Sequence, residues 1–410
     1  MTRVSAPQWG NPLWQSLLPL GRDPRTGGYR RYSFTEADSA CRDWFFRAAD
    51  ERKLPAHCDR NGNLWAWWGA EPTGAIVAGS HLDSVPDGGA FDGPLGVVSA
   101  FAAIDLLRER GVKPGRPIAV AAFMEEEGAR FGLACLGSKL LTGVVAPDVA
   151  RNLTDAAGVT FAEAMAGAGL DPGGLGRDDS LLAGISAVIE LHVEQGSALD
   201  GMGAAVGVAE SIWPHERRRI DFTGRADHAG TTKLKDRRDP MLPFASTVLA
   251  AREAASECGA VATMSKVVPV PGGANGICSA AHAWLDARAP DEETLRRLVA
   301  RVLESAQAAA QSHGVQVTSR RESFTSVVEF DLELRDRVAG ALASRGMPAP
   351  VLPTGAGHDA GVIAAERPAA MLFVRNRTGV SHSPFEHASP EDCEAGVAAL
   401  AAVLTDLACR

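Results

Sequence analysis

Histidine and carboxylate side chains, the types that hold metal ions in proteins, recur in this sequence where apolar segments end. His81 and Asp83 follow one such segment, and residues i and i+2 of a strand face the same way. Asp83 can therefore support the ring of His81. A carboxylate behind a metal-bound imidazole fixes its tautomer and raises its basicity. We predict that His81 is a metal ligand with Asp83 placed behind it.

Asp92 lies in the segment Gly88-Gly-Ala-Phe-Asp92-Gly93. Glycines on both sides let the backbone bend sharply and bring the Asp92 carboxylate to a shared centre. Because a carboxylate offers two oxygens, Asp92 could bridge two cations.

Three consecutive glutamates, Glu125, Glu126 and Glu127, follow a second apolar segment. Like charges at a buried strand end repel one another unless cations neutralise them, which a two-metal site would do. One glutamate can then bind metal while its neighbour stays free as a base. His192 and His382 complete a set of nitrogen ligands, and such a set suits zinc, and also cobalt, nickel or manganese.

Simpler interpretations compete with a metal site. A single histidine after a strand is more often hydrogen-bonded than metal-bound, and acidic clusters are more often solvated. Those interpretations must explain why four such residues lie at or near strand ends and why His382 lies in a Gly/Ser/Pro loop. The four are His81, Asp92, Glu127 and His192. His228, in Ala226-Asp-His228-Ala-Gly-Thr, is either a loop histidine or a donor to a developing oxyanion, delivered by a moving domain.

The elements that must position these residues follow from the hydrophobic pattern. Apolar strands are expected at 75–80, 117–124 and 187–191, each ending in acids or histidines, and open α/β sheets bind ligands at such ends. Further elements of this part are helices at 35–51, 95–110, 331–345 and 390–407 and a strand at 369–374.

The middle third of the chain has a different pattern. Its elements follow the order β-α-β-β-α-β of a ferredoxin-like domain. We expect a catalytic domain formed by residues 1–209 and 323–410, interrupted by an inserted domain at 210–322. The expected strands of the insert are 217–224, 261–267, 283–288 and 315–321, and its helices are 239–255 and 291–311.

Composition excludes several classes of protein. A chain of 410 residues is too long for one ordinary core. The net charge is -9 without a basic block, which argues against a nucleic-acid binder. The sequence contains no run of about 18 apolar residues, so no segment is expected to span a membrane. Seven scattered cysteines without a CxxC pair, and no signal peptide, indicate a reduced, cytoplasmic protein.

Six motifs together resemble the allantoate amidohydrolase and N-carbamoyl-L-amino acid hydrolase group. That group belongs to the zinc-peptidase-like superfamily of aminoacylases and carboxypeptidases. The resemblance runs from about His81 to Glu386 and implies an α/β catalytic domain with helices on both faces of a mixed sheet, interrupted by a dimerisation or lid domain. The motifs are GSHLDS from Gly79, GGAFDG from Gly88, MEEEGARF from Met124, ELHVEQG from Glu190, HAGTT from His228 and GVSHSP from Gly379.

The resemblance also implies roles for individual residues. Two divalent metal ions are implied, with zinc favoured: His81 and His192 would bind one, Glu127 and His382 the other, and Asp92 would bridge them. Glu126 would be the general base for the metal-activated water. His228 would reach the active site of a neighbouring subunit, which implies a homodimer built through the inserted domain.

The implied substrate is a small ureido compound that carries a carboxylate. Asn275 and Arg288 match positions that bind this carboxylate in the group, and a guanidinium suits it geometrically. Gly357 could contact substrate through its backbone. Two departures weaken the transfer of an exact substrate: His215 stands where glutamine is common, and Lys233 where proline is frequent.

The expected activity is hydrolysis of the carbamoyl C–N bond of allantoate, an intermediate of purine catabolism, or of an N-carbamoyl-L-amino acid. Ammonia and carbon dioxide would be released. Related substrates, such as β-ureidopropionate or ureidoglycolate, stay open. One alternative is a metal-dependent aminoacylase or dipeptidase acting on short N-acyl amino acids. Another is a binding protein on the same fold that has no catalytic activity.

Overall fold

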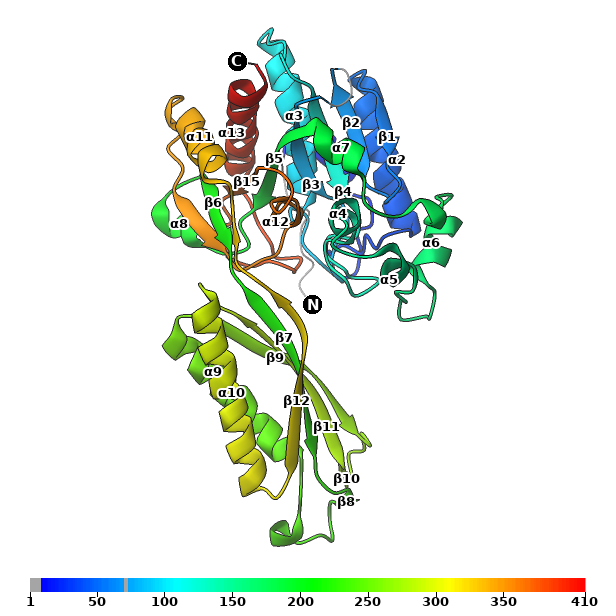
Figure 1. The fold of residues 1–410 in the computed structure, drawn as a ribbon, viewed down its shortest axis with the longest axis vertical. Coiled ribbons are helices and arrows are strands. Elements are labelled where there is room, and N and C mark those ends of the chain that lie inside the picture. The colour runs from blue at the N-terminus through cyan, green and yellow to red at the C-terminus, as the bar shows by residue number, and fades with distance from the viewer. Residues whose placement is uncertain (1–8, 70–72, 410) are drawn as a thin grey trace. The chain divides into compact units, whose positions relative to one another are not determined.

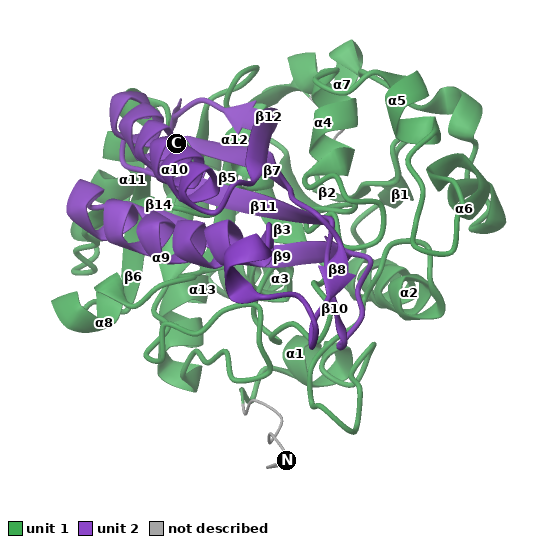
Figure 2. Cartoon of the chain, turned by 90° about the horizontal axis from the view of Figure 1, so that it is seen from below, with its two compact units in different colours: residues 1–210, 329–410 green, residues 211–328 purple. Residues whose placement is uncertain are grey.

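The computed structural model describes residues 9–69 and 73–409 of the chain. It forms two compact units, of which unit 1 combines residues 1–210 with 329–410 and unit 2 comprises residues 211–328 (Figure 2). The chain thus enters unit 2 after Glu210 and leaves it after Val328.

Unit 1 is built on a mixed sheet of nine strands (Figure 1). The strand order is β1-β2-β4-β3-β5-β15-β6-β13, and β14 pairs with β6. Strands β4, β3, β5 and β15 run parallel to one another, whereas β1 pairs antiparallel with β2, β2 with β4, and β6 with β15. The strands are β1 Ala56–Cys58, β2 Leu64–Trp68, β3 Ala75–His81, β4 Ile118–Phe123, β5 Ile185–Val193, β6 Val206–Ile212, β13 Val328–Glu329, β14 Val351–Thr354 and β15 Ala369–Val374.

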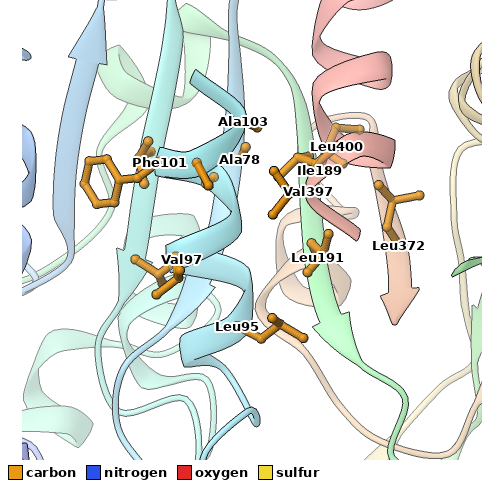
Figure 3. Close-up of a cluster of buried hydrophobic side chains, with 14 of the residues drawn as sticks. Ala78, Leu95, Val97, Phe101, Ala103, Ile189, Leu191, Leu372, Val397 and Leu400 are labelled. Carbon is orange, nitrogen blue, oxygen red and sulfur yellow. The ribbon is translucent and has the colours of Figure 1, made fainter. Parts of the chain in front are cut away.

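The parallel strands β3, β4 and β15 are buried along their whole length and are mostly apolar, because helices cover both faces of this part of the sheet. Leu95 of α3 (Pro94–Glu109) and Leu400 of α13 (Pro390–Ala408) lie beside Ile189 and Leu191 of β5, whereas Phe101 of α3 points away from this strand (Figure 3). Period-two alternation turns the side chains at 190 and 192 to the opposite face.

Shorter helices complete unit 1. On the opposite face of β5, α12 (Asp359–Ile363) contacts the strand, and its Ala360 N–H donates to Glu190 at 2.8 Å. The remaining helices are α1 Pro12–Leu17, α2 Glu36–Glu51, α4 Leu136–Thr142, α5 Pro147–Arg151, α6 Phe161–Gly167, α7 Asp179–Gly184, α8 Ala198–Met202 and α11 Leu332–Ala343. The α/β class with helices on both faces of a mixed sheet, expected from the sequence, is confirmed.

Unit 2 is a four-stranded antiparallel sheet of order β12-β7-β11-β9 with two helices on one face. Alternate residues of β11 are buried against these helices, as a half-buried strand requires. With its β-α-β-β-α-β order, this is the ferredoxin-like arrangement. The elements are β7 His215–Thr223, α9 Met241–Cys258, β9 Val261–Val270, β11 Ala280–Arg288, α10 Glu292–Ser312 and β12 Gln316–Thr325, and a small pair, β8 Asp227–His228 with β10 Gly276–Ile277.

Two general properties of the described residues bear on function. No helix within 9–69 and 73–409 is long and apolar enough to cross a membrane. The seven cysteines, all in the described part of the chain, are free thiols.

Candidate active site

Asp92 stands at the centre of the candidate site, with a different set of imidazoles at each of its two oxygens. Its Oδ1 lies 3.5 Å from His81 Nε2 and 3.2 Å from His192 Nε2. Its Oδ2 lies 3.4 Å from His382 Nε2. Three segments far apart in the sequence therefore converge on one buried carboxylate.

The two buried imidazoles present the nitrogen that a metal needs. His192 Nδ1 faces the carbonyl of Val193 at 2.8 Å, and His81 Nδ1 faces the carbonyl of Asp83 at 3.1 Å. This places the Nδ1 proton on the carbonyl side and leaves the Nε2 lone pair for a ligand. Both Nε2 atoms are buried and lack a hydrogen-bond partner. This donor set fits a divalent cation.

A second group joins Glu127 and His382 to the other oxygen of Asp92. Glu127 Oε2 lies 3.5 Å from His382 Nε2, and one ligand atom from each of the three residues lies within 4.8 Å of the others. His382 has a φ of 53°, the left-handed conformation that non-glycine residues rarely adopt, and 49% of its side chain is exposed. This position is therefore open to a substrate.

The site buries more carboxylates than imidazoles. Burial, reinforced by repulsion from Asp359 and Glu127, raises the pKa of Glu126 well above 4.5 despite the opposing attraction of His81. Burial followed by repulsion from Asp92 does the same to the pKa of Glu127. Burial lowers the pKa of His81, but neighbouring carboxylates, Glu126 first, outweigh it and raise that pKa well above 6.5. Bound cations would lower the pKa of these carboxyl groups again, because they stabilise the ionised form.

The side chain of Asp83 organises this cluster by accepting hydrogen bonds from backbone N–H groups. Its carboxylate accepts the backbone N–H of Glu126 at 3.1 Å and that of Glu127 at 3.0 Å. Its Oδ1 also lies 3.4 Å from His81 Nδ1. The Glu126 side chain extends into the site, where its Oε2 lies 3.6 Å from His81 Nε2. A carboxylate in this place can accept a proton from a water beside the candidate metal ligands.

Sequence reasoning gave no role to Gln195 or Glu386, which also contact the cluster. Gln195 Nε2 donates to Asp92 Oδ2 at 2.8 Å and lies 3.2 Å from His382 Nε2. The signal for Gln195 was its position three residues after His192 in ELHVEQG. Glu386 accepts the backbone N–H of Asp92 at 2.9 Å. Burial, followed by repulsion from Asp92, raises the pKa of Glu386 to about 8.

Glu190, His192 and His358 form a third group with ligand spacing. His192 Nδ1 faces a carbonyl, so only its Nε2 can bind metal, and that atom belongs to the group with His81 and Asp92. The two positions therefore cannot be filled together. His358 is buried with its ring centroid 4.5 Å from that of His192, and burial holds its pKa well below 6.5. It is a neutral neighbour of the site.

In unit 2, His228 and Asn275 are close to each other. β8 and β10 pair His228 with Gly276, and Asn275 accepts the Ala229 N–H through its carbonyl at 3.2 Å. His228 Nδ1 accepts the N–H groups of Gly230 at 3.0 Å and Thr231 at 3.2 Å. A neutral imidazole that accepts at Nδ1 carries its proton on Nε2. His228 is exposed, so it offers a hydrogen-bond donor at the surface.

His215 and Arg288 lie at the other end of the same sheet, where they are direct partners in the register of β7 and β11. The Arg288 guanidinium donates to Asp286 from Nε at 2.9 Å. His228 and Asn275 lie beyond the Ala280 end of β11, which is about 26 Å from Arg288 at ~3.3 Å per residue. The residues expected to bind substrate thus form two separate pairs within unit 2. Gly357 belongs to unit 1, where it is exposed two residues before α12.

Known proteins resemble the chain over almost its whole length. A model of the peptidase family M20/M25/M40 matches residues 77–406. An N-carbamoyl-L-amino acid amidohydrolase of Geobacillus stearothermophilus is 36% identical, over 95% of this chain and 97% of that protein. The allantoate amidohydrolase of Escherichia coli (strain K12) is 32% identical, over 96% of each chain. The crystal structure of AtUAH in complex with (S)-hydroxyglycine matches with a TM-score of 0.86 at 28% identity, over 98% of this chain and 99% of that chain.

These matches confirm the resemblance read from the six motifs. The relatives are named as amidohydrolases, which act on C–N bonds other than peptide bonds. Grouped histidines and carboxylates with ligand spacing agree with a metal requirement. The chain belongs to the peptidase family M20/M25/M40, within its allantoate amidohydrolase and N-carbamoyl-L-amino acid hydrolase group, and is a metal-dependent amidohydrolase.

Proposed function

We propose that this enzyme hydrolyses the carbamoyl C–N bond of an N-carbamoyl-L-amino acid or of allantoate. One water is consumed, and carbon dioxide, ammonia and the free amino compound are released. The observation that carries the proposal is the arrangement around Asp92, whose oxygens face His81 and His192 on one side and His382 on the other. Relatives named for both substrates support it.

Two divalent cations per subunit would be held by these residues, His81 and His192 at one, Glu127 and His382 at the other, with Asp92 between them. Zinc suits the mixed His and carboxylate set best, while manganese, cobalt and nickel are also compatible with it. When bound, such cations lower the pKa of a shared water and offset the charge of the carboxylates.

Glu126 acts as the general base in this proposal. Its carboxylate is oriented by the Asp83 contact to its backbone and lies beside His81. It takes a proton from the attacking water and delivers that proton to the leaving nitrogen. Asp83 holds the Glu126 and Glu127 backbones, so the base and a metal ligand keep a fixed spacing.

Unit 2 would supply the groups that recognise the substrate. Arg288 suits a carboxylate because its planar fork can donate two parallel hydrogen bonds. His215 is its direct neighbour and would shape the pocket where relatives of the group commonly have glutamine. Gly357 would contribute a backbone contact from unit 1.

His228 and Asn275 would act in the active site of a second subunit. They form a pair well separated from Arg288 along β11, so one substrate bound at Arg288 cannot span both pairs within one unit 2. The Nε2–H of His228 is suited to donate to a developing oxyanion. A homodimer through unit 2 is supported by β9, an edge strand on which Val261, Val268 and Val270 are 52%, 43% and 42% exposed.

A substrate panel on metal-loaded enzyme tests the activity. Allantoate and several N-carbamoyl-L-amino acids are compared with N-acetyl amino acids and dipeptides, with ammonia release for the first set and free amino acid for the second. We expect turnover only with the ureido compounds. Preferential cleavage of acetyl amino acids or dipeptides would contradict the proposal and favour an aminoacylase or dipeptidase.

A further inference from the structure

The Glu386 carboxylate joins two loops that are far apart in the sequence. Its Oε1 accepts the backbone N–H of Phe91 at 2.8 Å and that of Asp92 at 2.9 Å. Asp92 and Glu386 are 294 residues apart in the chain. The backbone that carries the central carboxylate is therefore held by a side chain from the C-terminal part of unit 1.

Ser381 makes the matching contact to the side chain of Asp92. Its hydroxyl lies 3.1 Å from Asp92 Oδ2 and 3.3 Å from Glu386 Oε2. Ser381 and Glu386 flank His382, whose Nε2 faces the same Asp92 oxygen. Both the backbone and the carboxylate of Asp92 are thus fixed by the segment 381–386 that presents His382.

The Glu386 side chain is closely packed between the two loops. Glu386 is 3% exposed. A Cβ placed on Gly89 would lie 2.4 Å from Glu386 Cδ and Oε1, so only glycine permits the carboxylate to approach the Phe91 and Asp92 amides. Burying a carboxylate is unfavourable unless its hydrogen bonds are satisfied, and here backbone amides and a hydroxyl satisfy them.

We propose that Glu386 is a positioning residue that fixes Asp92 and His382 relative to each other. It thereby determines how tightly the site binds its divalent cations. It contacts neither substrate nor the reacting atoms. The inference deepens the proposed function and rests on its two-cation site. Residues behind metal ligands act in this way by holding the ligand orientation before the ion arrives.

Metal binding to the stripped protein tests the proposal. Metal-free wild type, Glu386→Ala and Glu386→Gln are titrated with Zn²⁺ against a chromophoric chelator, and the affinities and stoichiometry are compared. We expect Glu386→Ala to bind about 10-fold to 100-fold more weakly, the usual cost of losing such a contact. Glu386→Gln should stay close to wild type, because its amide oxygen can accept both N–H groups while its NH₂ faces the Ser381 hydroxyl.

Control variants separate positioning from general loss of stability. Asp406→Ala removes another buried carboxylate, which accepts from Arg337 at 2.7 Å near the far end of α13. It should lower the thermal midpoint without changing Zn²⁺ affinity. If Glu386→Ala does not fold, Gly89→Ala serves in its place, because its methyl group displaces Glu386. Gly340→Ala is its control, since a Cβ there meets nothing within 4 Å.

The outcomes distinguish this inference from the proposed function. Wild type that binds no Zn²⁺ would remove the two-cation site itself. Wild type that binds two equivalents, with Glu386→Ala or Gly89→Ala binding equally tightly, would overturn the positioning role alone. Equal weakening in Glu386→Gln and Glu386→Ala, or in Asp406→Ala, would also overturn it.

Discussion

The carboxylate of Asp83 accepts the backbone N–H of Glu126 at 3.1 Å, although the two residues follow different strands of the sheet. The same carboxylate holds the N–H of Glu127 and lies beside His81. Asp83 therefore contacts both the proposed base and two proposed metal ligands. A substitution at Glu126 can therefore change the chemistry of the side chain while Asp83 still holds the backbone in place.

Replacing Glu126 by glutamine separates proton transfer from metal binding. Because Asp83 contacts the Glu126 backbone, Glu126→Gln should keep its metal content, while turnover falls by about 10²-fold to 10⁴-fold, the usual contribution of a general base. Elemental analysis and steady-state kinetics on the same preparation check this. Glu163→Gln, in an exposed helix cap where glutamine also functions, should behave as wild type. Retained turnover in Glu126→Gln would remove it as the base.

Removing the metal should abolish activity and lower stability together. Dialysis against a chelator leaves the buried carboxylates of the site with uncompensated charge, and a ligand that binds only the folded state stabilises it. We expect a lower thermal midpoint, with midpoint and ammonia release both restored by Zn²⁺, Mn²⁺, Co²⁺ or Ni²⁺. Full activity in protein with no measurable metal would argue against a metal-dependent reaction.

Subunit mixing tests whether His228 acts across a dimer. His228→Ala should lower turnover and leave metal content unchanged. In an equal mixture with Glu126→Gln, half of the dimers are mixed and each has one intact site, so about one quarter of wild-type activity should return. Refolding the two variants together ensures exchange of subunits, and each variant refolded alone is the control. No recovery in the mixture would place His228 outside a shared site.

Arg288 should affect substrate binding more than turnover. Arg288→Ala removes charge-assisted hydrogen bonds to the substrate carboxylate, so KM should rise about 10-fold to 100-fold with a smaller change in kcat. Arg288→Lys should recover little of this, because a point charge does not replace the fork. Arg217→Ala is the matched control, since Arg217 also binds Asp286, at 2.9 Å. An unchanged KM in Arg288→Ala would exclude Arg288 from the carboxylate pocket.

The long helices and the fully buried apolar strands were predictable from the sequence, whereas short helices and a partly polar strand were not. The helix expected at 35–51 occurs as Glu36–Glu51 with Thr35 as its cap, and the strand expected at 369–374 occurs unchanged. β6 and the short helices between β4 and β5 were not expected. The short helices carry too little periodicity, whereas β6 is partly polar and exposed and gains its hydrogen bonds from β15, which is distant in the sequence.

In the site, the sequence indicated the candidate metal-binding residues better than the residues that hold them in place. His81, Asp92 and Glu127 stand in recognisable motifs at strand ends, and the structure brings them together with His192 and His382. Glu386 carried no such signal, because its partners are backbone N–H groups, which look alike in every sequence. The two separate pairs in unit 2 also depend on strand register, which sequence spacing alone does not give.

The proposed sharing of Asp92 by two cations would affect how the enzyme is loaded with metal. A first ion would fix the rotamer of Asp92 and relieve the mutual repulsion of its neighbours, which changes the affinity for the second. The two positions should therefore not fill independently of each other. Because the proposed reaction needs both cations, activity would follow the filling of the second position when metal is scarce.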